Sequence, residues 1–99
     1  MTASSTEKLA EALLDCLGGS ANIKDVRYCS TRLRFRLKKK SRVDSDRLKM
    51  ISGIAAAAER NGQYQLVLVH YKTKDVYDAL TDNGLKGVGM VDAQDAWIN

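Results

Sequence analysis

Apolar residues near the start of the chain recur at intervals of three and four residues. They are Leu9, Leu13, Cys16 and Leu17. This spacing is typical of one face of an amphipathic helix. Ser4 and Glu7 precede the run with the spacing of a capping box, and glycines follow at positions 18 and 19. The pattern predicts a helix from about Thr6 to Leu17.

From residue 23 onward the period of the apolar positions shortens toward two, which is the period of a strand with one buried face. Val26 and Tyr28 alternate in one stretch, and the next stretch reads "RLRFRLK". We expect two strands joined by a turn around residues 29 to 31. The apolar side chains would face the core. The alternate residues, Arg32, Arg34 and Arg36, would form a row on the solvent face.

The second half of the chain continues with a similar order of elements. Asp44 can cap a helix that carries Leu48 and Ile51 inward, and Thr73 can cap a last helix with one apolar face. Between them, "QYQLVLV" reads as a strand. The preceding "IAAAAERNG" is ambiguous, because its alanines favour a helix whereas its turn-like end favours a hairpin. Residues 84–99 are glycine-spaced and sparsely apolar, as in a tail or linker.

The order helix, two strands, helix, two strands, helix predicts an α+β fold. We expect a two-layer sandwich in which a four-stranded antiparallel sheet carries three helices on one face. The chain's 99 residues are enough for one such domain. We assign residues 1–80 to the domain and residues 81–99 to a C-terminal tail or linker.

Positive charge is concentrated in one part of the chain. Residues 24 to 49 hold eleven of the sixteen Lys and Arg residues against three Asp, within a net charge of +4. Such a patch could meet nucleic acid, acidic lipid, an acidic protein face or a single phosphate. The sequence contains no long uncharged apolar run, so no membrane-spanning helix is predicted. The first residues do not resemble a secretory signal. We therefore expect a cytoplasmic chain whose two cysteines are free thiols.

The expected turn places Cys29 beside basic residues. Cations stabilise a thiolate, and a thiolate at such a turn could attack phosphorus while arginines neutralise the phosphoryl oxygens. Thr31 could add a hydroxyl donor. A cysteine beside a strand is also commonly a small buried apolar residue, and an arginine row is commonly a solvated face. The residues alone leave both alternatives open, whereas Cys16 is expected in the core.

Other chemistries have less support in the sequence. The chain has one histidine, His70, and two distant cysteines, which do not supply the ligand spacing of a structural zinc site. A dyad of Cys29 with His70 lacks an evident third residue. Nucleic-acid readers of the sheet type place aromatic residues among their basic ones, but Phe35 should face away from the arginines. We expect no metal, no cofactor and no nucleic-acid partner.

Four segments in order carry a family resemblance: "CSTRLRFRLK", "VDSDRLKMISGI", "NGQYQLVLV" and "DVYDAL". Together, from about Glu7 to Leu80, they resemble the IIB domain of the glucose–sucrose class in the bacterial phosphoenolpyruvate-dependent sugar phosphotransferase system. The family fold is a four-stranded antiparallel sheet with three helices on one side. The resemblance implies that Cys29 accepts a phosphoryl group from a phosphohistidine on a IIA domain. It would pass the group to a sugar held by a membrane-embedded IIC domain, so that the chain is a phosphohistidine–sugar phosphotransferase component.

The same resemblance implies roles for individual residues. Thr31, Arg32 and Arg34 match the rest of the cysteine motif and would bind the phosphoryl oxygens. Further candidates for lining the site are Tyr28, Ser30 and Gln65. Tyr28 departs from the family, which often has histidine or alanine before the cysteine.

The resemblance also implies a cellular place. Residues 81–99 would lead toward a IIC domain, and the chain would then work at the cytoplasmic face of the inner membrane without inserting into it. The alternatives are a regulatory IIB-like domain and a basic nucleic-acid-binding module without phosphotransfer.

Overall fold

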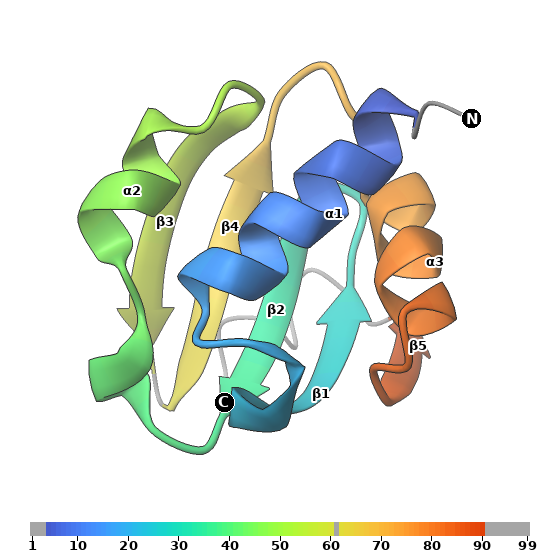
Figure 1. Ribbon diagram of the computed structural model, residues 1–99. Coiled ribbons are helices and arrows are strands. Elements are labelled where there is room, and N and C mark those ends of the chain that lie inside the picture. Colours follow the sequence, from blue (N-terminus) through green and yellow to red (C-terminus); the bar gives the residue numbers. More distant parts are fainter. Residues whose placement is uncertain (1–3, 61, 91–99) are drawn as a thin grey trace.

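A computed structural model describes residues 4–60 and 62–90 of the chain. In these residues three α-helices and five strands follow one another (Figure 1). The helices are α1 (Ser5–Cys16), α2 (Ser45–Met50) and α3 (Thr73–Asp82), with short 3₁₀ turns at Ser20–Asn22 and Lys40–Arg42. The strands are β1 (Ile23–Tyr28), β2 (Arg32–Leu37), β3 (Ile54–Arg60), β4 (Gln63–Leu68) and β5 (Gly87–Met90).

The strands form one sheet in the order β3-β4-β2-β1-β5. Neighbours are antiparallel except at one edge, where β5 runs parallel to β1. The three helices lie on one side of this sheet, with α1 crossing in front of its centre (Figure 1). We call the opposite side of the sheet the open face. It carries the side chains of each strand that point away from the helices. The α+β fold with three helices is therefore confirmed.

The prediction of four purely antiparallel strands was wrong, because β5 adds a fifth and parallel strand. Its sequence, "GVGM", has two glycines, which weaken the local strand signal. Gly87 is required by packing, since a Cβ atom there would overlap the Tyr77 hydroxyl of α3. Residues 87–90 thus belong to the sheet. Residues 91–99, the rest of the predicted tail, lie outside the described part of the chain.

The core lies between the sheet and the helices and follows the predicted periodicities. Its largest fully buried apolar side chains are Leu13, Leu17, Leu33, Phe35, Leu48, Leu66, Leu80, Val26 and Val76. Cys16 is also fully buried, as expected for a core residue, and burial raises the pKa of its thiol. Ile51 packs against this core from the end of α2. These side chains hold α1 and α3 against the sheet and so place the ends of β1 and β2.

Residues 54–60 of the ambiguous segment form a strand, β3, that pairs with β4 and is not a helix. The helix propensity of the four alanines is overridden by antiparallel pairing with β4, which extends from Ile54 to Arg60 with an irregularity at Ala55. Gly62 adopts a φ of 78° in the turn, a conformation that favours glycine, and its N–H donates to Glu59 Oε2 at 2.8 Å. Tertiary pairing therefore decides this element.

The first two helix caps agree with the sequence. Ser4 Oγ accepts a hydrogen bond from the Glu7 N–H at 3.1 Å, and Asp44 Oδ1 accepts one from the Arg47 N–H at 3.1 Å. No described helix is long and apolar enough to cross a membrane.

Candidate functional site

Cys29 lies directly after β1, in the turn that leads into β2. Its N–H donates to the Arg32 carbonyl at 2.9 Å, which closes the turn. Its Sγ lies 3.9 Å from Thr31 Oγ1. The residue is only 1% exposed, so its sulfur lies beneath the surface. Ser30 and Thr31 are exposed, which places the tip of the turn at the surface and the thiol beneath it.

A hydrogen bond from α3 holds this turn in place. The Thr73 hydroxyl is buried and donates to the Cys29 carbonyl at 2.6 Å. The prediction that Thr73 caps the last helix was wrong, because Thr73 is the first helical residue and Lys72 occupies the N-cap position without a side-chain hydrogen bond. The Thr73 hydroxyl instead donates to the carbonyl of a residue that is distant in the sequence. No local sequence pattern predicts this contact, which joins residues 44 positions apart.

We expect Thr73→Val to lower the free energy of unfolding by about 1–2 kcal/mol, because the buried Cys29 carbonyl would lose its hydroxyl partner. Urea denaturation followed by circular dichroism measures this loss. Thr73→Ser is the matched control, since it keeps the hydroxyl and should lose clearly less. A Thr73→Val variant as stable as the wild type would contradict this role of the hydrogen bond, and a larger loss in Thr73→Ser would show that the methyl group matters more.

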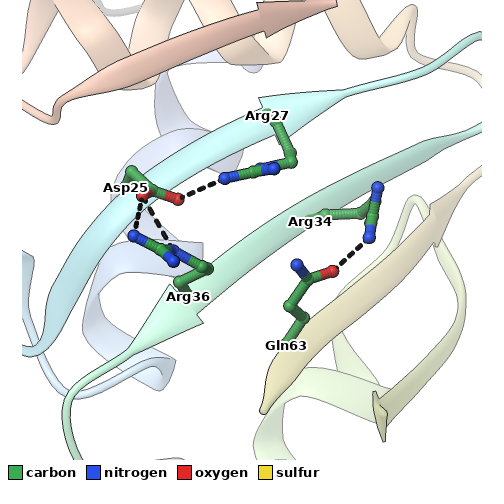
Figure 2. A network of polar contacts seen from close by, with 5 residues as sticks. All are labelled: Asp25, Arg27, Arg34, Arg36 and Gln63. Atoms are coloured by element: carbon green, nitrogen blue, oxygen red, sulfur yellow. Dashed lines mark hydrogen bonds and ion pairs between the residues drawn. The ribbon is translucent and has the colours of Figure 1, made fainter. Parts of the chain in front are cut away.

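Arginines of β2 lie on the open face, as the alternation predicted, but at different depths. Arg36 is exposed and Arg32 is half-buried. Arg34 is 2% exposed, so its predicted solvent exposure was wrong. Its Nη2 donates to Gln63 Oε1 on β4 (Figure 2). The strand register places Arg34 opposite Arg27 on one side and Gln65 on the other, which encloses its side chain.

A single buried carboxylate balances part of this positive charge. Asp25, on β1, is 4% exposed and accepts from Arg36 Nε at 2.9 Å and from Arg27 Nη2 at 3.4 Å (Figure 2). Arg27 Nε is buried and has no hydrogen-bond partner in the part of the chain that the structure describes. Four arginines of β1 and β2 therefore share the open face with one acidic residue of these strands, and the face should attract an anion.

We expect Asp25→Asn to destabilise the fold by about 2 kcal/mol, because it removes the charge that pairs two arginines in a largely buried place. Urea denaturation again supplies the measurement. The matched control is Asp15→Asn, whose ion pair with Arg47 is exposed and should contribute less than about 1 kcal/mol. Similar stabilities for the two variants would contradict a structural role for Asp25.

The structure places the remaining predicted residues differently. Gln65 is buried on the open face opposite Arg34, close to the arginines. Tyr28 pairs with Leu33 in the register and stacks on Tyr77 of α3, with ring centroids 4.6 Å apart. Its ring therefore belongs to the helix side of the sheet and not to the arginine side. Ser30 remains at the exposed tip of the turn.

Sequence reasoning overlooked Asp25 and Gln63 as parts of this site. A period of two along β1 puts Asp25 and Arg27 on one face, and the same period along β4 puts Gln63 beside Gln65. That signal was available. Their proximity to the β2 arginines follows only from the strand order. The described residues contain no group of three or more His, Cys, Asp or Glu side chains suited to hold a metal.

The open face also bears a groove next to the arginines. Its volume is about 390 Å³. It is lined by Arg32, Ala56, Ala57, Ala58, Glu59, Arg60, Gln65 and Val67. The groove extends from β2 across β4 to the edge strand β3, on the side of the arginine row that lies away from Asp25.

Comparison with known proteins connects this arrangement to one family. The sequence profile described as "phosphotransferase system, EIIB" matches residues 11–44, which include Cys29 and the β2 arginines. The beta-glucoside-specific EIIBCA component of Halalkalibacterium halodurans is 37% identical over 79% of this chain, and that of Dickeya chrysanthemi is 43% identical over 75%. The chain spans 12% of the length of each of these relatives.

The fold comparison agrees. A crystal structure of one domain of the PTS system IIabc component from Clostridium difficile superposes with a TM-score of 0.81 at 26% identity. The match covers 90% of this chain and 93% of that chain. Sequence similarity therefore covers about three quarters of the chain and fold similarity covers 90% of it, well beyond the cysteine motif alone.

Proposed function

Since the chain belongs to the EIIB family of the phosphotransferase system, we propose that it is a phosphoryl carrier that works through Cys29. It accepts the group from a phosphohistidine on a IIA domain and passes it to a sugar held by a IIC domain. The chain is then one component of a phosphohistidine–sugar phosphotransferase. The observation that carries this proposal is the position of Cys29 at the end of β1, where four arginines of β1 and β2 share one face.

The chemistry needs few groups from the protein. In the first step the Cys29 sulfur attacks phosphorus, a phosphorus–sulfur bond forms, and the phosphorus–nitrogen bond to the donor histidine breaks. In the second step a sugar hydroxyl attacks phosphorus and the thiolate leaves. Phosphoryl transfer depends mainly on positioning and on neutralising charge at the phosphoryl oxygens, and guanidinium groups suit that task. We propose no metal and no cofactor.

The residue roles follow from position. Arg32 and Arg34 bind the phosphoryl oxygens, and Thr31, whose hydroxyl already lies 3.9 Å from the sulfur, donates to one of them. Gln65 lies opposite Arg34 in the register and helps to position its side chain. Ser30 is exposed at the tip of the turn, where a donor would approach. Tyr28 acts indirectly, by packing the end of β1 on α3.

Transfer requires a small movement. Because Cys29 is 1% exposed, a donor histidine cannot reach its sulfur until the turn of residues 29–31 opens. The turn is anchored at one end by Thr73, whereas its tip is exposed. We propose that donor docking displaces the tip and leaves the anchored end in place, so that the sulfur keeps its relation to the arginines.

The partners and cellular place are part of the same proposal. The relatives are named as EIIBCA components, which supports a IIA donor and a IIC acceptor for this chain. Residues 91–99 would lead from the domain toward such a IIC domain, at the cytoplasmic face of the inner membrane. A nucleic-acid module is not favoured, since the strand register pairs Phe35 with buried residues of the helix side.

Transfer from phosphoenolpyruvate tests the proposal. The chain is incubated with phosphoenolpyruvate, the two general phosphotransferase proteins and a glucose-type IIA domain, and its intact mass is measured. We expect the mass of one phosphoryl group to be added, on a peptide that contains Cys29. Failure with every IIA subtype, in mixtures where each IIA is itself phosphorylated, would overturn the proposal.

A further inference from the structure

The guanidinium group of Arg27, on β1, is only loosely held. Its contact from Nη2 to Asp25 Oδ1 measures 3.4 Å, which is longer than a hydrogen bond between charged groups usually is. Its Nε is buried and has no hydrogen-bond partner within residues 4–60 and 62–90. A buried N–H without a partner costs free energy in the folded state. An anion that accepts from this N–H would remove that cost.

The fold places Arg27 beside the cysteine of the turn. Arg27 precedes Cys29 by two residues, so the period of a strand puts both side chains on the open face. Burial agrees with this placement. Among the described residues, Cys29 is buried without being a member of the hydrophobic core, whereas Tyr28, between the two, packs against that core. Because the register pairs Arg27 with Arg34, both arginines lie on the face to which the sulfur belongs.

In the free chain the Arg27 side chain points away from the cysteine. Figure 2 shows its guanidinium group turned back along β1 toward Asp25, the direction opposite to Cys29. Asp25 has a closer partner, since Arg36 contacts its Oδ2 through both Nε and Nη2 at 2.9 Å. The Asp25 carboxylate would therefore remain paired if Arg27 moved away.

A phosphoryl group on Cys29 would compete with Asp25 for this guanidinium group. A phosphoryl group carries a charge of about −1.5 to −2 near neutral pH, against −1 for a carboxylate. The Cα atoms of two residues that are two positions apart in a strand lie about 7 Å from each other. An extended arginine side chain can span that separation. Rotation of the Arg27 side chain is therefore enough to exchange one anion for the other.

We propose that Arg27 is a third arginine that binds the phosphoryl group, in addition to Arg32 and Arg34. Asp25 holds Arg27 while Cys29 carries no phosphate, and the phosphoryl oxygens bind it once Cys29 is phosphorylated. The buried Nε of Arg27 then donates to a phosphoryl oxygen. This inference rests on the proposed carrier function. It gives the open face a mobile positive charge that is paired in both states of the carrier.

A negative charge at position 29 tests this movement without any phosphotransfer partner. Cys29→Asp supplies that charge, and Cys29→Asn is the matched neutral control. Nitrogen nuclear magnetic resonance follows the Nε–Hε signal of Arg27, which is identified by its absence from Arg27→Lys. We expect the signal to shift, and its hydrogen exchange with water to slow several-fold, in Cys29→Asp alone. Identical signals in the two variants, with circular dichroism showing that both are folded, would overturn the proposal.

The phosphorylated chain supplies a second test, which still decides the question if Cys29→Asp does not fold. Phosphorus nuclear magnetic resonance follows the titration of the phosphocysteine with pH. A nearby cation stabilises the dianion of a phosphoryl group, so Arg27→Gln should raise the pKa of the phosphoryl group by about one unit. Lys24→Gln is the matched control, because it removes the same charge from an exposed position on β1, five residues before Cys29. It should leave the titration unchanged.

The outcomes separate this inference from the carrier function. If the wild-type chain takes phosphate on Cys29 but Arg27→Gln titrates as the wild type does, the role of Arg27 is overturned and the carrier function stands. An equal rise of the pKa in Arg27→Gln and Lys24→Gln would show a general effect of net charge, which also contradicts a direct contact. A wild-type chain that takes no phosphate would overturn both proposals.

Discussion

Cys29→Ser is expected to abolish phosphorylation of the chain by a phosphorylated IIA domain. A serine hydroxyl fits the site, since it is smaller than the thiol. It is, however, a far weaker nucleophile near neutral pH, because the reactive form of cysteine is the thiolate and serine needs an adjacent general base. Intact-mass measurement after incubation with phosphoenolpyruvate and the donor proteins gives the result.

The matched control for this variant is Cys16→Ala. Cys16 is also a buried free cysteine, but it is the last residue of α1 and packs in the core, where burial raises the pKa of its thiol. Its loss should leave phosphorylation intact. Incorporation of phosphate into Cys29→Ser, or its loss in a folded Cys16→Ala variant, would show that Cys29 is not the acceptor.

Elements with strong local patterns could be predicted from the sequence. The spacing of Leu9 and Leu13 identified α1, and the alternation of β2 identified both the strand and the face of its arginines. The caps at Ser4 and Asp44 were predictable for the same reason, since each depends on residues within one turn of helix. Local physics determines these features.

Features that depend on distant partners could not be predicted in this way. β5 exists because Gly87 fits beneath Tyr77 and its backbone pairs with β1, neither of which is visible in a glycine-rich sequence. By local rules the Thr73 hydroxyl would accept a hydrogen bond from an N–H of its own helix, but in the fold it donates to the distant Cys29 carbonyl.

The depth of the site residues is another feature of this kind. Alternation predicts the direction in which an arginine points, but not how far its neighbours cover it. Arg34 is buried because a central strand places Gln63 and Gln65 on one side of it and Arg27 on the other. Cys29 is buried because the turn is drawn onto α3. The type and face of the candidate site residues were therefore predictable, whereas their burial was not.

Phosphoryl transfer has two half-reactions, acceptance from the IIA domain and transfer to sugar. Because Arg34 is buried, we expect its substitution to change the rates of the two half-reactions most unequally. We expect Arg34→Lys to accept a phosphoryl group from the IIA domain at nearly the normal rate and to pass it to sugar about 100-fold more slowly. Lysine keeps the positive charge that attracts the phosphoryl group, so acceptance should survive. Lysine cannot bind two phosphoryl oxygens at once as a guanidinium can. This two-point contact matters most during transfer to sugar, when negative charge returns to the Cys29 sulfur as the leaving group.

The measurement for Arg34→Lys separates the two steps. Acceptance is followed by intact mass, and onward transfer by chasing the phosphorylated chain with vesicles that contain the IIC part of a beta-glucoside permease and its labelled sugar, after transfer by the wild-type chain is established. Arg36→Lys is the matched control, because Arg36 is exposed and already pairs with Asp25, and both of its half-reactions should stay near normal. Equal losses in the two half-reactions of Arg34→Lys would contradict this division, and would mean that Arg34 serves the site through its contact with Gln63 instead of through the phosphoryl oxygens.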